Sequence, residues 1–183
     1  MRPNFAEHLK QIDLTWILSK GIAPAAIIGS TTAADELCRG RVTFSQCGRF
    51  FDPLEDGDDP GEALTAYVWT ARDSIGDPAD AVAWHPRTGR LALHEGGVPL
   101  IGVENISAPR MDDALSVFDN PLAWLADGRR GALLLPGRDA EAVEALRWSG
   151  PIVPQTLALA ERLAAAHESA LQILVPDFER RAA

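Results

Sequence analysis

Five side chains that could bind a metal ion or exchange protons lie within residues 77–96, DPADAVAWHPRTGRLALHEG: Asp77, Asp80, His85, His94 and Glu95. Carboxylates and imidazoles are the usual ligands of divalent metals and the usual general acids and bases. His94 and Glu95 are adjacent, however, and adjacent side chains of a strand point to opposite faces. Only one of these two residues can therefore join a given site.

The same stretch also has a purely structural interpretation, which we favour. Asp77 before a proline is typical of a helix N-cap with proline at N1, so the pattern predicts a short helix over residues 77–84. His85 then stands at the helix C-terminus, where a positive charge is tolerated. Glu95 follows in a strand, and any catalytic or metal-binding role for it depends on partners elsewhere in the chain.

A second set of candidates lies in LLLPGRDAEAV, where a predicted strand leads into a helix. Gly137 and Arg138 precede the helix N-terminus, whose free N–H groups and positive dipole can hold an anion. Asp139 and Glu141 follow in the first turn, where they stabilise the helix dipole without a ligand and would repel a phosphate. The stretch lacks both the dinucleotide-binding and the Walker glycine patterns. An anion site at Gly137 and Arg138 therefore competes with an ordinary solvated helix start.

Other common site patterns are missing from the sequence. There is no Gly-x-Ser-x-Gly elbow, and neither cysteine lies in a recognisable Cys/His signature, so we predict no catalytic residue. An EF-hand loop starting at Asp52 fails, because Leu54 and Ala63 stand where ligands are needed. The acidic segment 52–62 is expected to be an exposed loop, or at most part of a surface that mimics nucleic-acid charge.

Composition restricts the class of protein. The chain has 183 residues, of which 46% are hydrophobic and 23% charged, which is typical of a folded domain with its own core. A net charge of −9 argues against direct binding to nucleic acid or to an anionic membrane. No apolar run has the length of a membrane span, and no secretory signal or Cys-x-x-Cys is recognisable. We expect a cytoplasmic protein that does not enter a membrane.

These candidate residues are positioned by elements that the hydrophobic periodicity predicts. We expect an α+β fold with N-terminal helices, central antiparallel strands and a C-terminal βαβαβ parallel unit. The predicted helices cover residues 4–20, 25–28 and 33–38; a hairpin turns at Gln46-Cys47-Gly48; and strands cover 64–71, 131–136, 150–154 and 171–176. We divide the chain into an N-terminal helical segment, 1–40, and an α/β domain, 41–183, within one compact whole.

The middle of the chain carries a resemblance to a group of proteins. The run TAYVWTARDSIGDPADAVAWHPRTGRLALHEGGVPLIG, followed by NPLAWLADGRRGALLLP, resembles uncharacterised proteins encoded in proteobacterial phages and prophages. Similar proteins share a strand, a short Asp-rich helix, a strand that closes on an apolar residue and glycine, and a Pro-Leu-x-Trp-Leu helix. The resemblance covers roughly residues 41–175 and implies no particular activity.

A more remote resemblance is to the Toprim modules of primases. There a Glu-Gly after one strand and an Asp-x-Asp after a later strand hold magnesium together. Glu95-Gly96 matches the first element, whereas Asp139 and Glu141 lie at a helix start instead of at the strand end. The resemblance implies a Mg²⁺ site at Glu95, Asp139 and Glu141, or a degenerate relative that has lost it.

Two functional hypotheses follow. The leading one is a non-catalytic binding or accessory protein of a phage or mobile element, which needs no cofactor and acts through contacts with another protein. The alternative is a metal-dependent nucleic-acid-processing enzyme, or its degenerate relative, that uses Mg²⁺. The alternative requires the three carboxylates to converge in space. Whether the protein is an enzyme stays open at this point, although the missing catalytic motifs favour a protein without enzymatic activity.

Overall fold

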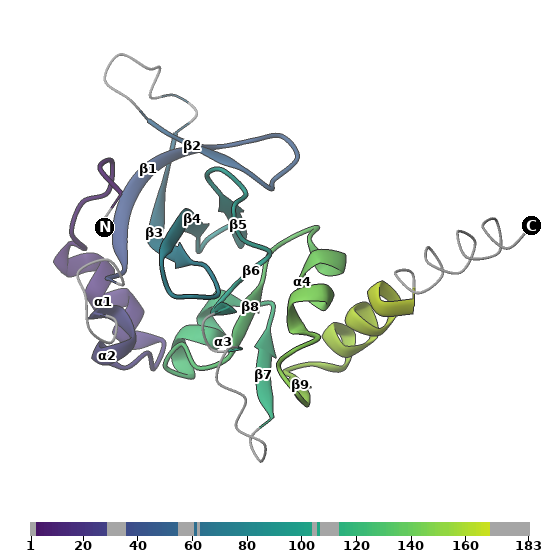
Figure 1. Ribbon diagram of the computed structural model, residues 1–183. Helices are drawn as coiled ribbons and strands as arrows, with labels where there is room; N and C mark the ends of the chain where they lie inside the picture. The colour runs from purple at the N-terminus through teal and green to yellow at the C-terminus, as the bar shows by residue number, and fades with distance from the viewer. Residues whose placement is uncertain are drawn as a thin grey trace, which may run out of the picture.

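The computed structural model describes residues 3–28, 36–54, 61, 63–103, 106 and 114–168. These residues form a five-stranded antiparallel sheet, called sheet A, and a four-stranded mixed sheet, called sheet B, together with helices on their flanks (Figure 1). The predicted α+β class is therefore confirmed. None of the helices among these residues has both the length and the apolar character that a bilayer-spanning helix needs.

Sheet A has the strand order β2-β1-β3-β4-β5, and all of its neighbours are antiparallel; the strands are β1 (Cys38–Phe44), β2 (Phe51–Pro53), β3 (Leu64–Arg72), β4 (Pro78–His85) and β5 (Arg90–Leu93). Buried residues alternate with more exposed ones along β1, as expected for a strand with one covered face. The predicted hairpin turn is present, and Gly48 adopts a φ of 70° there, a conformation that favours glycine. The predicted strand 64–71 corresponds to β3.

The predicted helix over residues 77–84 is wrong, because this segment forms β4. Val82 pairs with Trp69 of β3 on one side and with Leu93 of β5 on the other. Alternate side chains enter different cores: Val82 and Trp84 pack in one cluster, while Ala81 and Ala83 pack in another. Pairing on both edges and burial on both faces outweigh the local cap signal. His85 consequently ends a strand instead of a helix.

Asp77 is not a helix cap. It lies in the turn between β3 and β4, where its backbone N–H donates to Oδ1 of Asp73 at 2.9 Å. The same oxygen accepts from the N–H of Ile75 at 3.0 Å. Asp73 therefore organises this turn in the way that aspartate commonly does, and the following proline begins β4.

The N-terminal helices are α1 (Gln11–Ser19) and α2 (Pro24–Ile28), which lie beside sheet A (Figure 1). The predicted first helix starts later than expected, because Glu7 pairs with Arg39 as a backbone extension of the sheet. Of the predicted helix 33–38, residues 33–35 lie outside the described residues, and Cys38 already belongs to β1.

Sheet B has the order β6-β8-β7-β9; its strands are β6 (Leu100–Ile101), β7 (Leu115–Phe118), β8 (Ala132–Leu134) and β9 (Ile152–Pro154). β7 runs parallel to both β8 and β9, whereas β6 is antiparallel to β8. Two helices connect the parallel strands, α3 (Pro121–Ala126) and α4 (Asp139–Leu146), and residues 157–168 form a further helix.

The parallel unit thus begins one strand earlier than predicted, with β7 lying between β8 and β9. The short apolar β7 is followed by Asn120, whose side chain caps α3, and by Pro121 at the first helical position. These residues make a β–α unit whose helix contains the Pro-Leu-x-Trp-Leu segment of the resemblance, while its strand β7 was not predicted. The predicted strand 171–176 lies outside the described residues.

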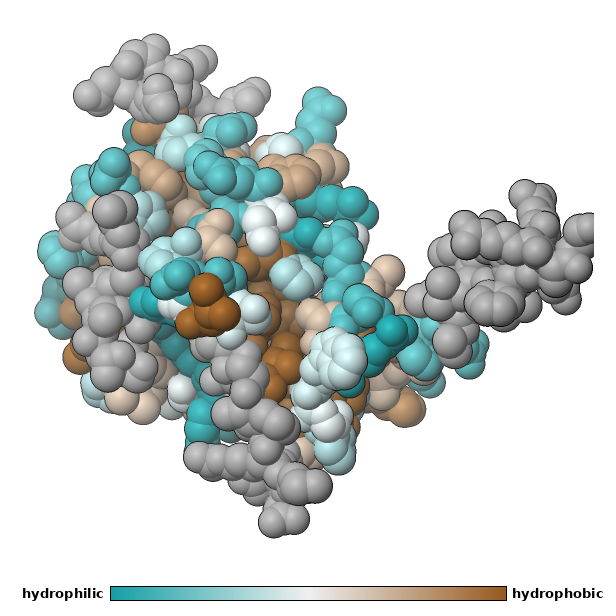
Figure 2. Space-filling view, in the orientation of Figure 1, coloured by the Kyte–Doolittle hydropathy of each residue, from teal (hydrophilic) through white to brown (hydrophobic). Residues whose placement is uncertain are grey.

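One hydrophobic cluster joins the parts of the fold. It contains Trp69 and Trp84 from sheet A, Phe118 from sheet B, and Trp124 from α3, and it includes Ile17 of α1. The indole rings of Trp69 and Trp124 lie 6.0 Å apart between the two sheets. Hydrophobic residues also gather near the middle of the face in Figure 2, among hydrophilic ones. Residues of the predicted segment 1–40 are therefore part of the same core as both sheets.

Candidate functional site

Two of the three carboxylates predicted to hold Mg²⁺ are paired with different arginines. Glu141 pairs with Arg138, and Asp139 accepts a hydrogen bond from Nε of Arg162 at 3.1 Å. The third residue, Glu95, makes a backbone contact, in which its N–H donates to Asp80 at 3.0 Å. Within the described part of the chain, no group of three or more His, Cys, Asp or Glu side chains could hold a metal ion. The predicted convergence of Glu95, Asp139 and Glu141 is therefore wrong.

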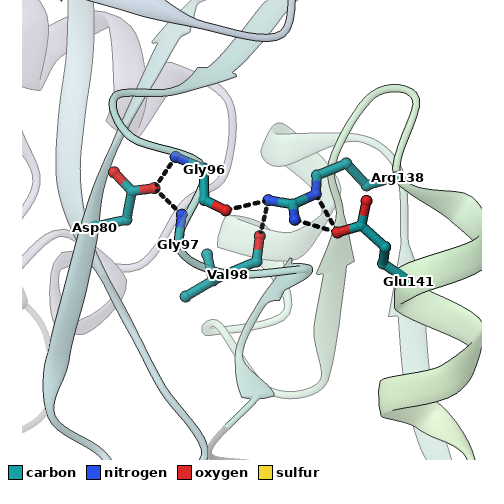
Figure 3. A network of polar contacts seen from close by, with 6 residues as sticks. All are labelled: Asp80, Gly96, Gly97, Val98, Arg138 and Glu141. Atoms are coloured by element: carbon teal, nitrogen blue, oxygen red, sulfur yellow. Dashed lines mark hydrogen bonds and ion pairs between the residues drawn. The ribbon is translucent and has the colours of Figure 1, made fainter.

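Arg138, predicted as an anion ligand, is occupied by protein acceptors (Figure 3). One terminal nitrogen donates to the carbonyls of Gly96 at 2.7 Å and Val98 at 2.6 Å, while Nε donates to Glu141 at 2.7 Å. The other terminal nitrogen also contacts Glu141. Gly137 is covered as well, since a Cβ there would lie 2.6 Å from the Arg49 guanidinium. This geometry favours a structural role over an anion site at Gly137 and Arg138.

Asp80 holds the other side of the same loop (Figure 3). Its carboxylate accepts backbone N–H groups from Ala81 at 2.7 Å, Glu95 at 3.0 Å, Gly96 at 2.7 Å and Gly97 at 2.8 Å. Together with the Arg138 contacts, these bonds connect β4 of sheet A through the loop to the start of α4. We call this network, formed by Asp80, residues 95–98, Arg138 and Glu141, the loop clamp.

His94, the remaining candidate of the first stretch, is a packing residue. Its Nδ1 lies 3.2 Å from the carbonyl oxygen of Phe51, to which a protonated Nδ1 can donate. Its ring packs 5.5 Å from the Phe51 ring and 6.3 Å from that of Phe5. Asp80 and His94 therefore stabilise the fold through their side chains, whereas His85 lines a cavity.

His85 lines a recess of about 710 Å³ between α1, β1, β3 and the turn after β4. The volume is in the range of sites that hold small organic molecules. The lining consists of Ile12, Asp13, Trp16, Arg39, Thr65, Tyr67, His85, Pro86 and Arg87. The recess therefore combines an aromatic wall with several hydrogen-bonding groups.

Regular structure positions these side chains. Asp13 and Trp16 are three residues apart in α1 and share a face of the helix. Thr65 and Tyr67 are two apart in β3 and share a face of sheet A. Arg39 is the direct cross-strand partner of Tyr67, so its side chain leaves the sheet on the same face.

Asp13 is the hub of the polar contacts. Its Oδ2 accepts the backbone N–H of Lys10 at 3.0 Å and a guanidinium N–H of Arg39 at 3.2 Å. Asp13 also hydrogen-bonds the Tyr67 side chain, whose hydroxyl donates. Burial, followed by the charge and the hydrogen bond of Asp13, raises the pKa of Tyr67 to about 12 against the opposing charge of Arg39.

The aromatic wall of the recess is formed by Trp16 and Tyr67, and the buried Trp84 packs against both rings. Trp16 stacks on Tyr67 with a centroid distance of 5.8 Å and an interplanar angle of 27°. Trp84 packs 5.7 Å from Tyr67 and 6.2 Å from Trp16. Lys20 lies 5.6 Å from the Trp16 centroid, within the range of a cation–π contact. Trp16 is only half-buried, which leaves part of its ring available at the recess.

The contacts of His85 favour one tautomer of the neutral ring. Its Nδ1 accepts the backbone N–H of Thr88 at 3.3 Å and lies 2.8 Å from the Thr88 hydroxyl. From these contacts we assign the imidazole proton to Nε2. Burial, followed by the charges of Arg87 and Arg90, lowers the pKa of His85 and keeps the ring uncharged near neutral pH.

From the sequence, Trp16 was expected only as part of the helix 4–20 and His85 as a helix end, and Asp13, Arg39 and Tyr67 were not selected. Asp13 and Trp16 have helical spacing that could have suggested a shared face. The alignment of Arg39 with Tyr67 depends on strand register between segments that are 28 residues apart. Local sequence patterns do not predict that strand register.

The single tyrosine of the chain gives a direct test of the recess geometry. With a pKa of about 12 in the folded protein and an ordinary value of 10, Tyr67 stays protonated in the fold while the unfolded chain ionises. It therefore stabilises the folded state below pH 10, and that stability is lost as the pH rises from 10 towards 12. Near-ultraviolet tyrosinate absorbance should show this delayed ionisation in the folded protein and a midpoint near 10 in denaturant.

Asp13→Asn should lower the Tyr67 midpoint without abolishing the shift, because burial remains. Glu95→Gln, which removes an acid that does not line the recess, should leave the midpoint unchanged. Circular dichroism at each pH confirms that the chain is folded. A midpoint near 10 in the folded wild-type protein would contradict the contact between Tyr67 and Asp13.

A second cleft, of about 370 Å³, lies between α4, β9 and helical residues 157–168. Its lining is mainly apolar, with Arg147 and His167 as the ionisable residues. Trp148, which is 76% exposed, follows α4 in the chain. The mostly hydrocarbon lining gives this cleft little chemical selectivity, in contrast to the recess.

The chain matches no family model, no curated protein and no solved structure. The resemblances to phage-encoded proteins and to Toprim modules therefore remain predictions from the sequence. The geometry of the described residues is the basis for assigning a function.

Proposed function

We propose that this chain is a non-catalytic binding protein and that the recess holds a small organic ligand. The observation that carries the proposal is the convergence of Trp16, Arg39, Tyr67 and His85 from α1, β1, β3 and the end of β4 around one cavity. Ligand sites commonly combine such an apolar wall with a few fixed polar groups.

The protonation states in the recess support binding without chemistry. A general base needs a free lone pair and a pKa near the working pH. Asp13 already accepts from three donors, and Nδ1 of His85 is occupied by Thr88. Tyr67 has a raised pKa and stays protonated. These contacts favour a binding role for Asp13, Tyr67 and His85 over proton transfer.

Binding can be tested by NMR with ring compounds that differ in charge: adenosine, adenosine monophosphate, indole-3-carboxamide and indole-3-carboxylate. At least one probe should shift the amide signals of recess residues such as Asp13, Tyr67 and His85. If none of the four does so, the proposed function is wrong. Specificity for the recess is then checked with variants.

Trp16→Ala should weaken binding of the active probe at least about tenfold, because a base or indole ring loses its stacking surface. Trp148→Ala is the matched control, since Trp148 is exposed and lies outside the recess. Thr65→Trp, which fills the recess from β3 and leaves Trp16 in place, should also block binding. Unchanged affinity in a folded Thr65→Trp variant would contradict the site.

We also propose, from the sequence, that the protein works in the cytoplasm as an accessory protein of a phage or mobile element in contact with another protein. The absence of any complete catalytic pattern in an acidic, well-packed chain supports this role. An affinity-tagged chain expressed in its host should retain one partner in stoichiometric amount through high-salt washing. Repeated purification without such a partner would contradict the proposal.

A further inference from the structure

We infer that the recess binds an organic anion, with the negative group held by Arg87 and His85 and a planar ring placed against Trp16. This inference rests on the proposed function, because it names the ligand class of the same recess. It follows from which groups already have partners and which are left for a ligand.

Among the described residues that line the recess, Asp13 is the one acidic side chain. Its carboxylate is 12% exposed and accepts from the Lys10 backbone, from Arg39 and from Tyr67. A cationic ligand would have to displace at least one of these donors and leave it unsatisfied, which is costly in a largely buried position. Asp13 therefore positions the recess and is not available to recognise a positive charge.

The groups that remain are hydrogen-bond donors. Arg87 is exposed at the rim, and within the described residues its guanidinium has no hydrogen bond or ion pair. His85, two residues away, has Nδ1 occupied by Thr88, so Nε2–H is the ring atom left for another partner. A ligand that supplies acceptors can replace water at these donors, and a guanidinium binds a carboxylate or phosphate most strongly.

The local charge points the same way. Arg39 and Arg87 line the recess and Lys20 lies over the Trp16 ring, against a single carboxylate from Asp13. This is an excess of positive charge within a chain whose net charge is −9. Such a local excess draws an anion to the recess although the protein as a whole repels it.

The ring of the ligand is specified by Trp16. Stacking on Tyr67 fixes the orientation of the indole, so its remaining surface is a preformed flat contact. A recess of about 710 Å³ has room for a ring together with an anionic group. A small inorganic anion would leave this aromatic wall unused.

The inference is tested with two matched pairs, adenosine monophosphate against adenosine and indole-3-carboxylate against indole-3-carboxamide, by isothermal titration calorimetry at low salt. In at least one pair the anion should bind about tenfold or more tightly than its neutral partner, as expected for one charge-assisted contact. Raising the salt concentration should weaken binding of the anion and leave the affinity for the neutral compound nearly unchanged.

Arg87→Gln should remove most of that preference, lowering the affinity for the anion about tenfold and changing that for the neutral compound little. Arg90→Gln is the control, because Arg90 is equally exposed, belongs to the same hairpin, and lies over the Phe44 ring outside the recess. Neutral and anionic partners binding equally, or both arginine variants having the same effect, would overturn the inference and leave the proposed function intact. Failure of all four compounds to bind would instead reject the proposed function itself.

Discussion

Asp80→Ala should be among the most destabilising substitutions of a half-buried polar residue in this protein, lowering the free energy of unfolding by about 3 kcal/mol or more. The carboxylate accepts four backbone N–H groups, three of them from residues 95–97. Its removal leaves these donors without an acceptor and releases the loop that Arg138 holds from the other side. Urea denaturation followed by tryptophan fluorescence measures the loss.

Asp77→Ala is the matched control, because Asp77 is exposed and its side chain makes no hydrogen bond among the described residues. This substitution should lower the free energy of unfolding by no more than about 0.5 kcal/mol. Asp80→Asn should fall between the two, since the amide keeps one acceptor oxygen and turns an NH₂ group towards N–H donors. Equal stability of Asp80→Ala and Asp77→Ala would contradict the loop clamp.

The two aspartates also show where sequence reasoning stops. The sequence marked both as ligand-type residues and gave the capping role to Asp77, because Asp before Pro is a strong local signal. The residue that organises backbone N–H groups is instead Asp80, and three of its four partners are 15 to 17 positions away. A contact of that range depends on strand pairing, which local spacing does not encode.

Elements with short-range determinants were easier to predict. The hairpin around Gly48 and strand β3 follow from alternation and a glycine turn, and α4 follows from an acidic first turn with helical periodicity. Segment 77–84 failed because its alternating pattern of alanines, valine and tryptophan fits two covered faces of a strand as well as one face of a helix. Pairing with β3 and β5 decided between them.

The candidate site was harder still, because its residues come from separate elements. The predicted set of Glu95, Asp139 and Glu141 was chosen by analogy with a motif, whereas the fold pairs Asp139 and Glu141 with different arginines and forms no metal-binding group among the described residues. The recess depends on α1 lying against the face of sheet A that carries Arg39 and Tyr67. His85 is the one residue that was a candidate from the sequence and also lines the recess. Its contact with Thr88 and its position beside Arg87 define its proposed role in ligand binding.

Gly131→Ala should cost about 4 kcal/mol, because it combines a strained backbone with a steric clash. Gly131 has a φ of 90°, and a Cβ there would lie 2.2 Å from the carbonyl oxygen of Ser116. The side chain could be accommodated only by separating the start of β8 from β7, where Val117 pairs with Ala132. That shift would also disturb the hydrogen bond from the Trp124 indole to the Gly131 carbonyl, which is 3.3 Å long.

Gly150→Ala separates the contribution of backbone strain from that of the steric clash. Gly150 has a comparable φ of 75°, but a Cβ there would meet no atom within 4 Å. Its substitution should therefore cost only the left-handed backbone penalty, about 1–2 kcal/mol. Thermal unfolding of both variants, with near-ultraviolet circular dichroism to follow the Trp124 environment, measures the difference. If Gly131→Ala and Gly150→Ala lose the same stability, then β7 and β8 do not approach as closely as the structure indicates, and the parallel centre of sheet B is packed differently.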